Sequence, residues 1–115
     1  MNTHGMNWIR QERRLAIYIR DGFTCVYCTR DLRDVAPGEL TLDHLMPRER
    51  GGGNESTNLV TACRACNSSK HDRTLEEYIA SLSESDHTIR LRIEYTSAQF
   101  VNVPLARSIL FDRVQ

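Results

Sequence analysis

Apolar residues at helical spacing mark the first element that the chain predicts. Residues 7–22 read "NWIRQERRLAIYIRDG", and Gly22 follows the last apolar position as a typical helix stop signal. The apolar residues of one broad face are Trp8, Ile9, Leu15, Ala16 and Ile19. We therefore expect an amphipathic N-terminal helix, with Trp8 and Tyr18 packed in the core rather than exposed as stacking surfaces for bases.

Short apolar runs with polar segments between them predict strands. Residues 40–47, "LTLDHLMP", and 58–63, "NLVTAC", each suit a short strand, and the glycine-rich stretch at 48–57 suits a flexible loop between them. Residues 23–28, "FTCVYC", predict a further strand that runs into a tight turn, and a loop with a Pro-Gly turn follows at 30–39. These patterns predict a hairpin near the middle of the chain.

The remainder of the chain predicts helices. A helix is expected to begin in residues 64–72, and Thr74 with Glu77 forms a capping-box pattern that opens another. The segment at 87–97 alternates as a strand would, yet its isoleucines also suit a helix, and we expect a helix. Pro104 fits the first turn of a final short helix.

Composition indicates one soluble globular domain. The chain has 115 residues and a formal net charge of zero, which argues against reliance on bulk positive charge to hold nucleic acid. Its apolar runs are too short to span a membrane, and its N-terminus lacks the apolar region of a secretory signal. We expect a cytoplasmic protein that has no membrane association.

Four cysteines form a CxxC…CxxC pattern with 34 residues between the pairs: Cys25, Cys28, Cys63 and Cys66. Two such knuckles can complete a tetrahedral Zn²⁺ site with Zn–S bonds of about 2.3 Å. All four ligands would be cysteines, which leaves no open position for catalysis, so we expect a structural zinc. Two disulfides or a redox CxxC fit a reduced cytosolic chain less well.

An acid and an imidazole stand side by side in the first predicted strand of the hairpin. Asp43 and His44 should point to opposite faces of that strand. Asn67 follows the last cysteine, and His71 lies four residues later on the same face of the predicted helix. These side chains could converge between the hairpin and the helix, where oxygen ligands and waters would suit Mg²⁺ or Mn²⁺.

These residues resemble the HNH endonucleases, a family with the ββα-metal fold. The resemblance covers residues 20–73: an Asp-His pair, Pro47 and a glycine-rich loop, an "NL" dipeptide that begins at Asn58, and CxxC followed by Asn67 and a lysine. The third signature position is Asn67 rather than His, as in an HNN variant of the family. His71 departs from the small residue that is often found at its position.

The resemblance implies a role for each of these residues. His44 would be the general base that takes a proton from the attacking water, since an imidazole titrates near neutrality. Asp43 and Asn67, with His71, would hold one catalytic Mg²⁺ or Mn²⁺ that stabilises charge on the phosphate and the leaving oxygen. Asn58 would tie the loop and so orient His44. The products would carry a 5′-phosphate and a 3′-hydroxyl.

Each role has a simpler alternative. Asp43 could pair with an arginine, Asn67 could be a helix N-cap, and His71 could be solvent-exposed. The three glycines at 51–53 do not form a phosphate-binding pattern and more simply permit an unusual loop. Five basic residues in or beside the motif are candidate DNA phosphate contacts, although charged loop residues are ordinarily solvated: Arg48, Arg50, Arg64, Lys70 and Arg73.

The sequence thus predicts a single α+β domain over residues 1–115, with a zinc-stapled ββα-metal core, an N-terminal helix and a helical extension at 74–115. We expect a DNA endonuclease of low sequence specificity, bacterial or phage-encoded, that nicks double-stranded or single-stranded DNA as a monomer or weak dimer. One alternative is a zinc-stabilised nucleic-acid-binding module without activity. Another is an interaction protein that docks a partner through its acidic tail.

Overall fold

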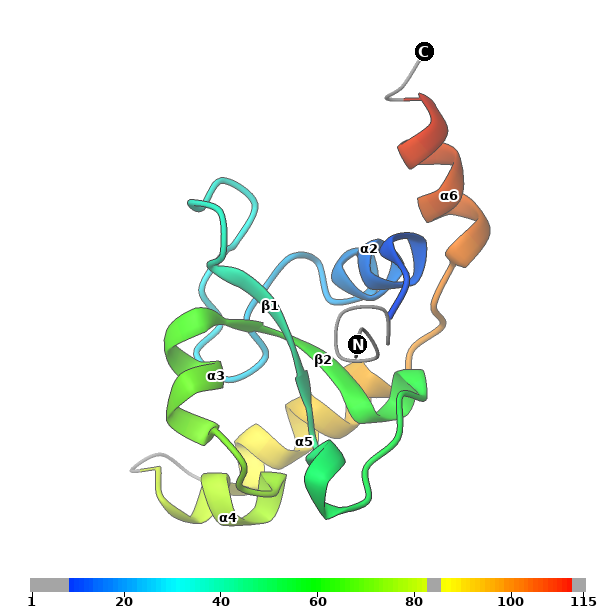
Figure 1. Cartoon of the computed structure of the whole chain (residues 1–115). Coiled ribbons are helices and arrows are strands. Elements are labelled where there is room, and N and C mark those ends of the chain that lie inside the picture. Colours follow the sequence, from blue (N-terminus) through cyan, green and yellow to red (C-terminus); the bar gives the residue numbers. More distant parts are fainter. Residues whose placement is uncertain (1–8, 83–85, 113–115) are drawn as a thin grey trace, which may run out of the picture.

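The computed structural model describes residues 9–82 and 86–112, which form a small α+β fold (Figure 1). A two-stranded antiparallel hairpin lies at its centre, with helices packed around it. Along the chain the elements are α2 (Gln11–Arg20), β1 (Leu40–His44), η1 (Arg48–Arg50), η2 (Ser56–Asn58), β2 (Leu59–Cys63), α3 (Arg64–Lys70), α4 (Leu75–Ala80), α5 (Asp86–Ser97) and α6 (Val103–Asp112). The predicted fold class is therefore confirmed.

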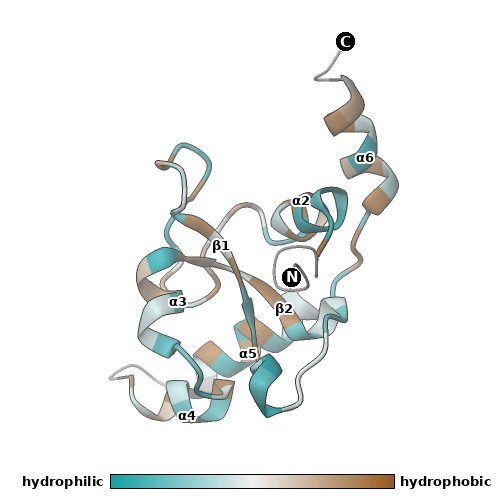
Figure 2. Ribbon diagram, viewed as in Figure 1, coloured by the Kyte–Doolittle hydropathy of each residue, from teal (hydrophilic) through white to brown (hydrophobic). Residues whose placement is uncertain are grey.

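The hairpin register assigns each strand residue to one of two faces. Leu42 lies opposite Thr61, and His44 lies opposite Leu59, so these residues share one face, while Asp43 lies opposite Val60 on the other. Strand β1 changes from an apolar start to a hydrophilic end, whereas β2 is apolar throughout most of its length (Figure 2). The polar end of β1 therefore carries the hairpin residues that could act as catalytic groups or metal ligands, Asp43 and His44.

Each face of the hairpin packs into its own hydrophobic core. On one face Leu42 and Leu59 contact Ile17 and Tyr18 of α2. On the other face the apolar residues of β2 pack with the first cysteine knuckle and with buried residues from α4 and α5, which include Tyr78, Ile79, Ile89 and Ile93. Burial of apolar surface on both faces holds β1 in one register, so the polar residues at its end have defined positions.

A buried ion pair connects α2 to the hairpin. The Arg20 and Asp21 side chains are each only 1% exposed, with Nε and Oδ1 2.6 Å apart. Arg20 also donates hydrogen bonds to three backbone carbonyls, at Ser56, Leu59 and Ser97, at 2.6–3.2 Å. These bonds satisfy the guanidinium inside the protein and fix where the second strand begins.

The helices at 74–115 are part of the packed body. Arg92 of α5 donates hydrogen bonds to the carbonyls of Val26 and Tyr27, both at 2.9 Å, and so holds the first cysteine knuckle. Helix α6 packs against α2, where Arg107 forms an ion pair with Glu12 at 2.6 Å. Truncation within this segment would remove core residues, so it is a poor test of the partner-docking alternative.

Several predicted elements agree with the structure. Thr74 and Glu77 form the expected capping box at α4, the segment at 87–97 lies in a helix, and Pro104 lies in the first turn of α6. No helix in residues 9–82 and 86–112 is long and apolar enough to cross a membrane.

Other predictions were wrong or fall outside the described residues. The strand expected at 23–28 is absent; Thr24 forms a single bridge with Asp31, because the knuckle turn takes up the rest of that segment. Of the predicted apolar face of the first helix, Ile9 and Ala16 are buried as expected, whereas Leu15 and Ile19 are only half-buried. The deepest residue of α2 is Ile17, because the helix packs with a face that is partly rotated from the predicted one. Trp8 lies outside the described residues.

Candidate metal and catalytic centre

The four cysteines meet as one cluster. Their sulfur atoms all lie within 4.8 Å of one another, and no disulfide joins them. In each knuckle a sulfur accepts a backbone hydrogen bond: Cys25 Sγ from the Cys28 N–H at 3.5 Å, and Cys63 Sγ from the Cys66 N–H at 3.4 Å. Such bonds to sulfur support thiolate ligands.

The cluster fits a tetrahedral Zn²⁺. The Cys28 and Cys63 sulfur atoms are 3.8 Å apart, which equals the edge of a tetrahedron whose centre lies about 2.3 Å from each sulfur. Burial raises the pKa of the Cys25 and Cys66 thiols, and the charges of the neighbouring sulfur atoms raise that of Cys66 further. A bound cation would offset both effects, so the cluster is consistent with a structural zinc.

A second centre lies where the polar end of β1 meets α3. A pocket of about 340 Å³ opens there. Its polar lining consists of Asp43, His44, Arg48, Glu49, Asn67 and His71. The four residues that were predicted to share one site therefore line one cavity.

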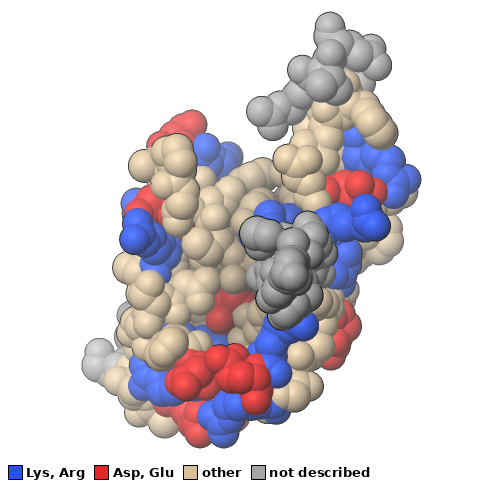
Figure 3. Space-filling model, viewed as in Figure 1, with Lys and Arg blue, Asp and Glu red and all other residues tan. Residues whose placement is uncertain are grey.

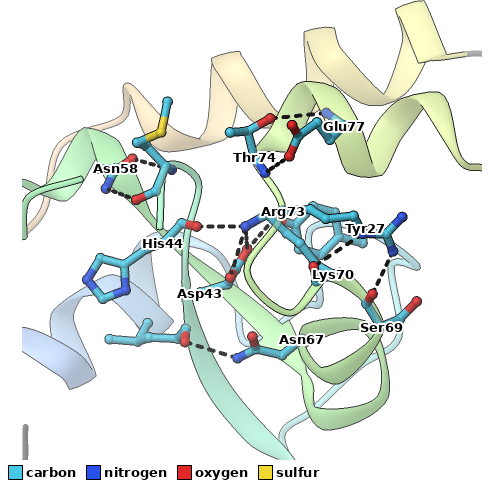
Figure 4. A network of polar contacts seen from close by, with 12 residues as sticks. Tyr27, Asp43, His44, Asn58, Asn67, Ser69, Lys70, Arg73, Thr74 and Glu77 are labelled. Atoms are coloured by element: carbon cyan, nitrogen blue, oxygen red, sulfur yellow. Dashed lines mark hydrogen bonds and ion pairs between the residues drawn. The ribbon is translucent and has the colours of Figure 1, made fainter. Parts of the chain in front are cut away.

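Asp43 occupies the buried side of this pocket and is only 5% exposed. Its carboxylate accepts a short hydrogen bond from the Tyr27 hydroxyl and lies 3.3 Å from the Lys70 ammonium group (Figure 4). Burial raises the pKa of the Asp43 carboxyl, while the charge of Lys70 opposes that shift. Burial and the nearby Asp43 charge raise the pKa of Tyr27 well above its usual value, so Tyr27 remains a donor.

His44 leaves the opposite face of the strand and is held by a loop residue. Its Nε2 atom lies 2.7 Å from the Asn54 amide oxygen. Because an amide oxygen only accepts, His44 must donate from Nε2. In the neutral imidazole the lone pair then belongs to Nδ1. Asp43 and His44 thus diverge from β1 as predicted, and both line the same pocket.

Helix α3 contributes the remaining two candidates. Asn67 donates hydrogen bonds to Thr41 Oγ1 at 2.9 Å and to the Leu42 carbonyl at 3.1 Å, which leaves its amide oxygen as the acceptor end. His71 lies just past the end of the helix, with φ of 54°, and is not on the helical face that was predicted for it. This turn nevertheless leaves His71 in the pocket lining.

The donors in this pocket fit a hard divalent cation that retains waters. One carboxylate, one amide oxygen and one imidazole line a cavity that is large enough for an ion with part of its hydration shell. Mg²⁺ and Mn²⁺ accept such sets, and Mg²⁺ usually keeps several waters.

A model of the HNH endonuclease family matches residues 25–73, the segment that carries both centres. This segment is an HNH endonuclease domain. HNH endonucleases are metal-dependent nucleases that hydrolyse phosphodiester bonds of nucleic acids. No curated protein matches the chain.

Asn58, which the sequence resemblance predicts to orient His44, closes the loop between the strands. Its amide oxygen accepts from the Met46 N–H at 2.9 Å, and its amide nitrogen donates to the carbonyls of Met46 and Gly53 at 3.1 and 2.9 Å. A Cβ atom at Gly52 would lie 1.8 Å from the Met46 oxygen, so only glycine fits this approach. The loop is therefore tied and contains two short 3₁₀ turns, rather than being freely flexible.

The five basic candidates beside the HNH motif lie in different environments. Arg48 and Arg64 are exposed, and Arg48 lines the pocket. Arg50 forms an ion pair with Glu77 at 2.6 Å, and Arg73 lies over the Tyr78 ring. Lys70 is fully buried and donates to the His44 carbonyl, so it is no longer a candidate for a phosphate contact.

Sequence reasoning missed three residues of the HNH site. Asn54 contacts His44, Tyr27 contacts Asp43, and Glu49 lines the pocket. Asn54 lies beside three glycines, where the sequence indicates only an unusual loop. Tyr27 lies inside the first knuckle, whose contact with β1 depends on how the four cysteines assemble. Glu49, an acidic residue two positions after the predicted strand, was a signal that could have been used.

Proposed function

We propose that this HNH domain is a DNA endonuclease in which His44 is the general base. The observation that carries the proposal is the pocket where Asp43, His44, Asn67 and His71 converge from the strand end and the following helix. A base on one side and oxygen donors on the other suit a phosphodiester held between them.

His44 would take the proton from the attacking water. Asn54 accepts the Nε2 hydrogen of His44 at 2.7 Å, and this bond favours the tautomer whose lone pair lies on Nδ1. We assign proton abstraction to Nδ1. Asn54 is then a positioning residue, because it fixes the ring and its tautomer without contact to the substrate.

Asp43, Asn67 and His71 would hold the divalent cation. When bound, Mg²⁺ or Mn²⁺ supplies Lewis-acid stabilisation of the phosphate and the leaving oxygen. The hydrogen bonds of Asn67 to β1 orient its amide oxygen, and Tyr27 fixes one carboxylate oxygen of Asp43. Asn58 would support the same centre from the loop side, since its three bonds close the segment that carries Asn54.

The expected reaction is a nick in one strand of DNA with little sequence preference. The chain contributes one such pocket per molecule in its described residues, which supports cutting one strand at a time. Positive and negative side chains are interspersed over the face in Figure 3, and the net charge is zero, so we do not base DNA binding on a broad basic surface. Phosphate contacts would instead come from individual basic residues, with Arg48 in the pocket lining and Arg50 and Arg64 as further exposed candidates.

A supercoiled plasmid tests this proposal. The purified protein with saturated zinc and added Mg²⁺ or Mn²⁺ should convert supercoiled to open-circular DNA, and DNA ligase alone should seal the nicks. Sealing requires a 5′-phosphate next to a 3′-hydroxyl, so it reports the product ends. DNA binding without nicking in either metal would instead support a binding module without activity.

A further inference from the structure

The single lysine of the chain is completely buried, and it contacts two residues of the pocket lining, Asp43 and His44. Lys70 is 0% exposed. Its Nζ atom donates to the His44 carbonyl at 2.8 Å, and lies 3.3 Å from Asp43 Oδ2 and 3.4 Å from Oδ1 (Figure 4). Lysine is almost never fully buried without a partner, so this arrangement requires an explanation beyond packing.

The geometry shows how the ammonium group is anchored. Its shortest bond is to the backbone carbonyl of His44, whereas the two distances to the Asp43 carboxylate are long for hydrogen bonds. Asp43 has a second donor in the Tyr27 hydroxyl. Lys70 can therefore keep its bond to the backbone while Asp43 Oδ1, which Tyr27 does not hold, binds another cation.

We propose that Lys70 is the internal counter-cation of Asp43, which neutralises the carboxylate whenever no divalent cation is bound. This inference rests on the proposed function only for the identity of that cation. An uncompensated buried carboxylate is strongly destabilising, and Asp43 is 5% exposed. With Lys70 in place, the site keeps its shape without metal, and Mg²⁺ can bind and leave without unfolding the strand end.

Lys70 also couples the two sides of the catalytic centre. Its bond to the His44 carbonyl fixes the backbone from which the general base projects, and its charge faces the carboxylate on the opposite face of β1. It is thus a positioning residue.

A double-mutant cycle in urea tests the charge pairing. Zinc is kept saturated, and Mg²⁺ and Mn²⁺ are left out. Lys70→Met should raise the unfolding equilibrium constant by at least about a hundredfold. In an Asp43→Asn background the same change should raise it by no more than about tenfold, because only the bond to the His44 carbonyl is then lost. Arg64→Met, an exposed change on the same helix, is the matched stability control.

Equal losses in both backgrounds would overturn the proposal, since Lys70 would then stabilise the fold independently of Asp43. If Lys70→Met alone does not fold, a folded Asp43→Asn/Lys70→Met protein supports the proposal and an unfolded one overturns it.

Addition of Mg²⁺ supplies a second readout that does not depend on activity. Mg²⁺ prefers oxygen ligands, so it should leave the zinc on the thiolates. Added Mg²⁺ should lower the unfolding equilibrium constant of Lys70→Met by a factor at least about ten times larger than the factor for the wild type. Equal stabilisation of both proteins by Mg²⁺ would contradict the proposal that Lys70 and Mg²⁺ compensate the same charge on Asp43. The cycle tests Lys70 and the plasmid assay tests the nuclease, so either can fail while the other stands.

Discussion

Asp43 and His44 are neighbours in the chain, yet the strand gives them different surroundings. Asp43 is enclosed by Tyr27 and Lys70, while His44 contacts Asn54 at the loop side of the pocket. Strand alternation was sufficient to predict that their side chains diverge. It could not predict the burial of Lys70, because lysine is ordinarily exposed and its partners come together only in the folded chain.

The hydrogen bond between Asn54 and His44 makes a prediction at the scale of one residue. Asn54→Ala removes the acceptor for Nε2, so the ring and its tautomer are no longer fixed. We expect kcat for nicking to fall by about tenfold or more, with little change in KM for DNA. The ¹⁵N shifts of the His44 ring nitrogens should report a mixture of tautomers in the variant and a single one in the wild type.

Asn54→Asp retains an acceptor oxygen and serves as the conservative comparison. It should keep more activity than Asn54→Ala, because it still accepts the Nε2 hydrogen of His44. Wild-type kcat together with unchanged ring signals in Asn54→Ala would contradict the role of Asn54 as the residue that positions the His44 ring.

At the scale of elements, local pattern predicted most of what forms. The hairpin and the capping box at α4 follow from periodicity and capping, whereas the pattern at 87–97 suited a strand as well as the helix that we expected and that forms as α5. The strand at 23–28 failed because the knuckle turn and its backbone bonds override β propensity. The face of α2 was misjudged because tertiary packing, rather than the helix itself, decides which residue lies deepest.

The loop tied by Asn58 makes a prediction at this scale. Asn58→Ala removes three hydrogen bonds to Met46 and Gly53. We expect a loss of about 1–3 kcal/mol in the free energy of unfolding, because three hydrogen bonds that close the loop are lost together. Nicking should also slow, since the same loop carries Asn54, while the zinc content stays unchanged.

Urea denaturation and a zinc assay check this prediction. Thr57→Ala, an exposed neighbour in η2, provides the control and should behave as the wild type. A fully stable and active Asn58→Ala protein would show that the loop keeps its conformation without the three hydrogen bonds of Asn58.

At the scale of the whole molecule, the cysteine cluster joins segments that are distant in the chain. The first knuckle precedes the hairpin, and the second joins β2 to α3. Arg92 of α5 donates hydrogen bonds to backbone carbonyls of the first knuckle. The cysteine spacing predicted this cluster. It could not predict that the C-terminal helices complete the core, because no pattern in residues 74–115 indicates which surface they cover.

Loss of the zinc site should therefore affect the whole fold. Cys63→Ser removes one ligand and also the sulfur that accepts from the Cys66 N–H. We expect the variant to lose zinc and to unfold, because metal binding and folding are coupled at such sites. Metal analysis and far-UV circular dichroism measure both effects, and a well-folded variant without zinc would contradict the structural assignment.

The rate of plasmid nicking by His44→Ala tests the central claim most directly. The variant should retain the wild-type circular dichroism spectrum and zinc content, yet nick supercoiled DNA at least about a hundredfold more slowly in saturating Mg²⁺ or Mn²⁺, since general base catalysis contributes about that much or more. Tyr95→Ala, a change at a side chain that is exposed on α5, is the control and should nick at the wild-type rate. Nicking by His44→Ala at the rate of the wild type would contradict the assignment of His44 as the general base.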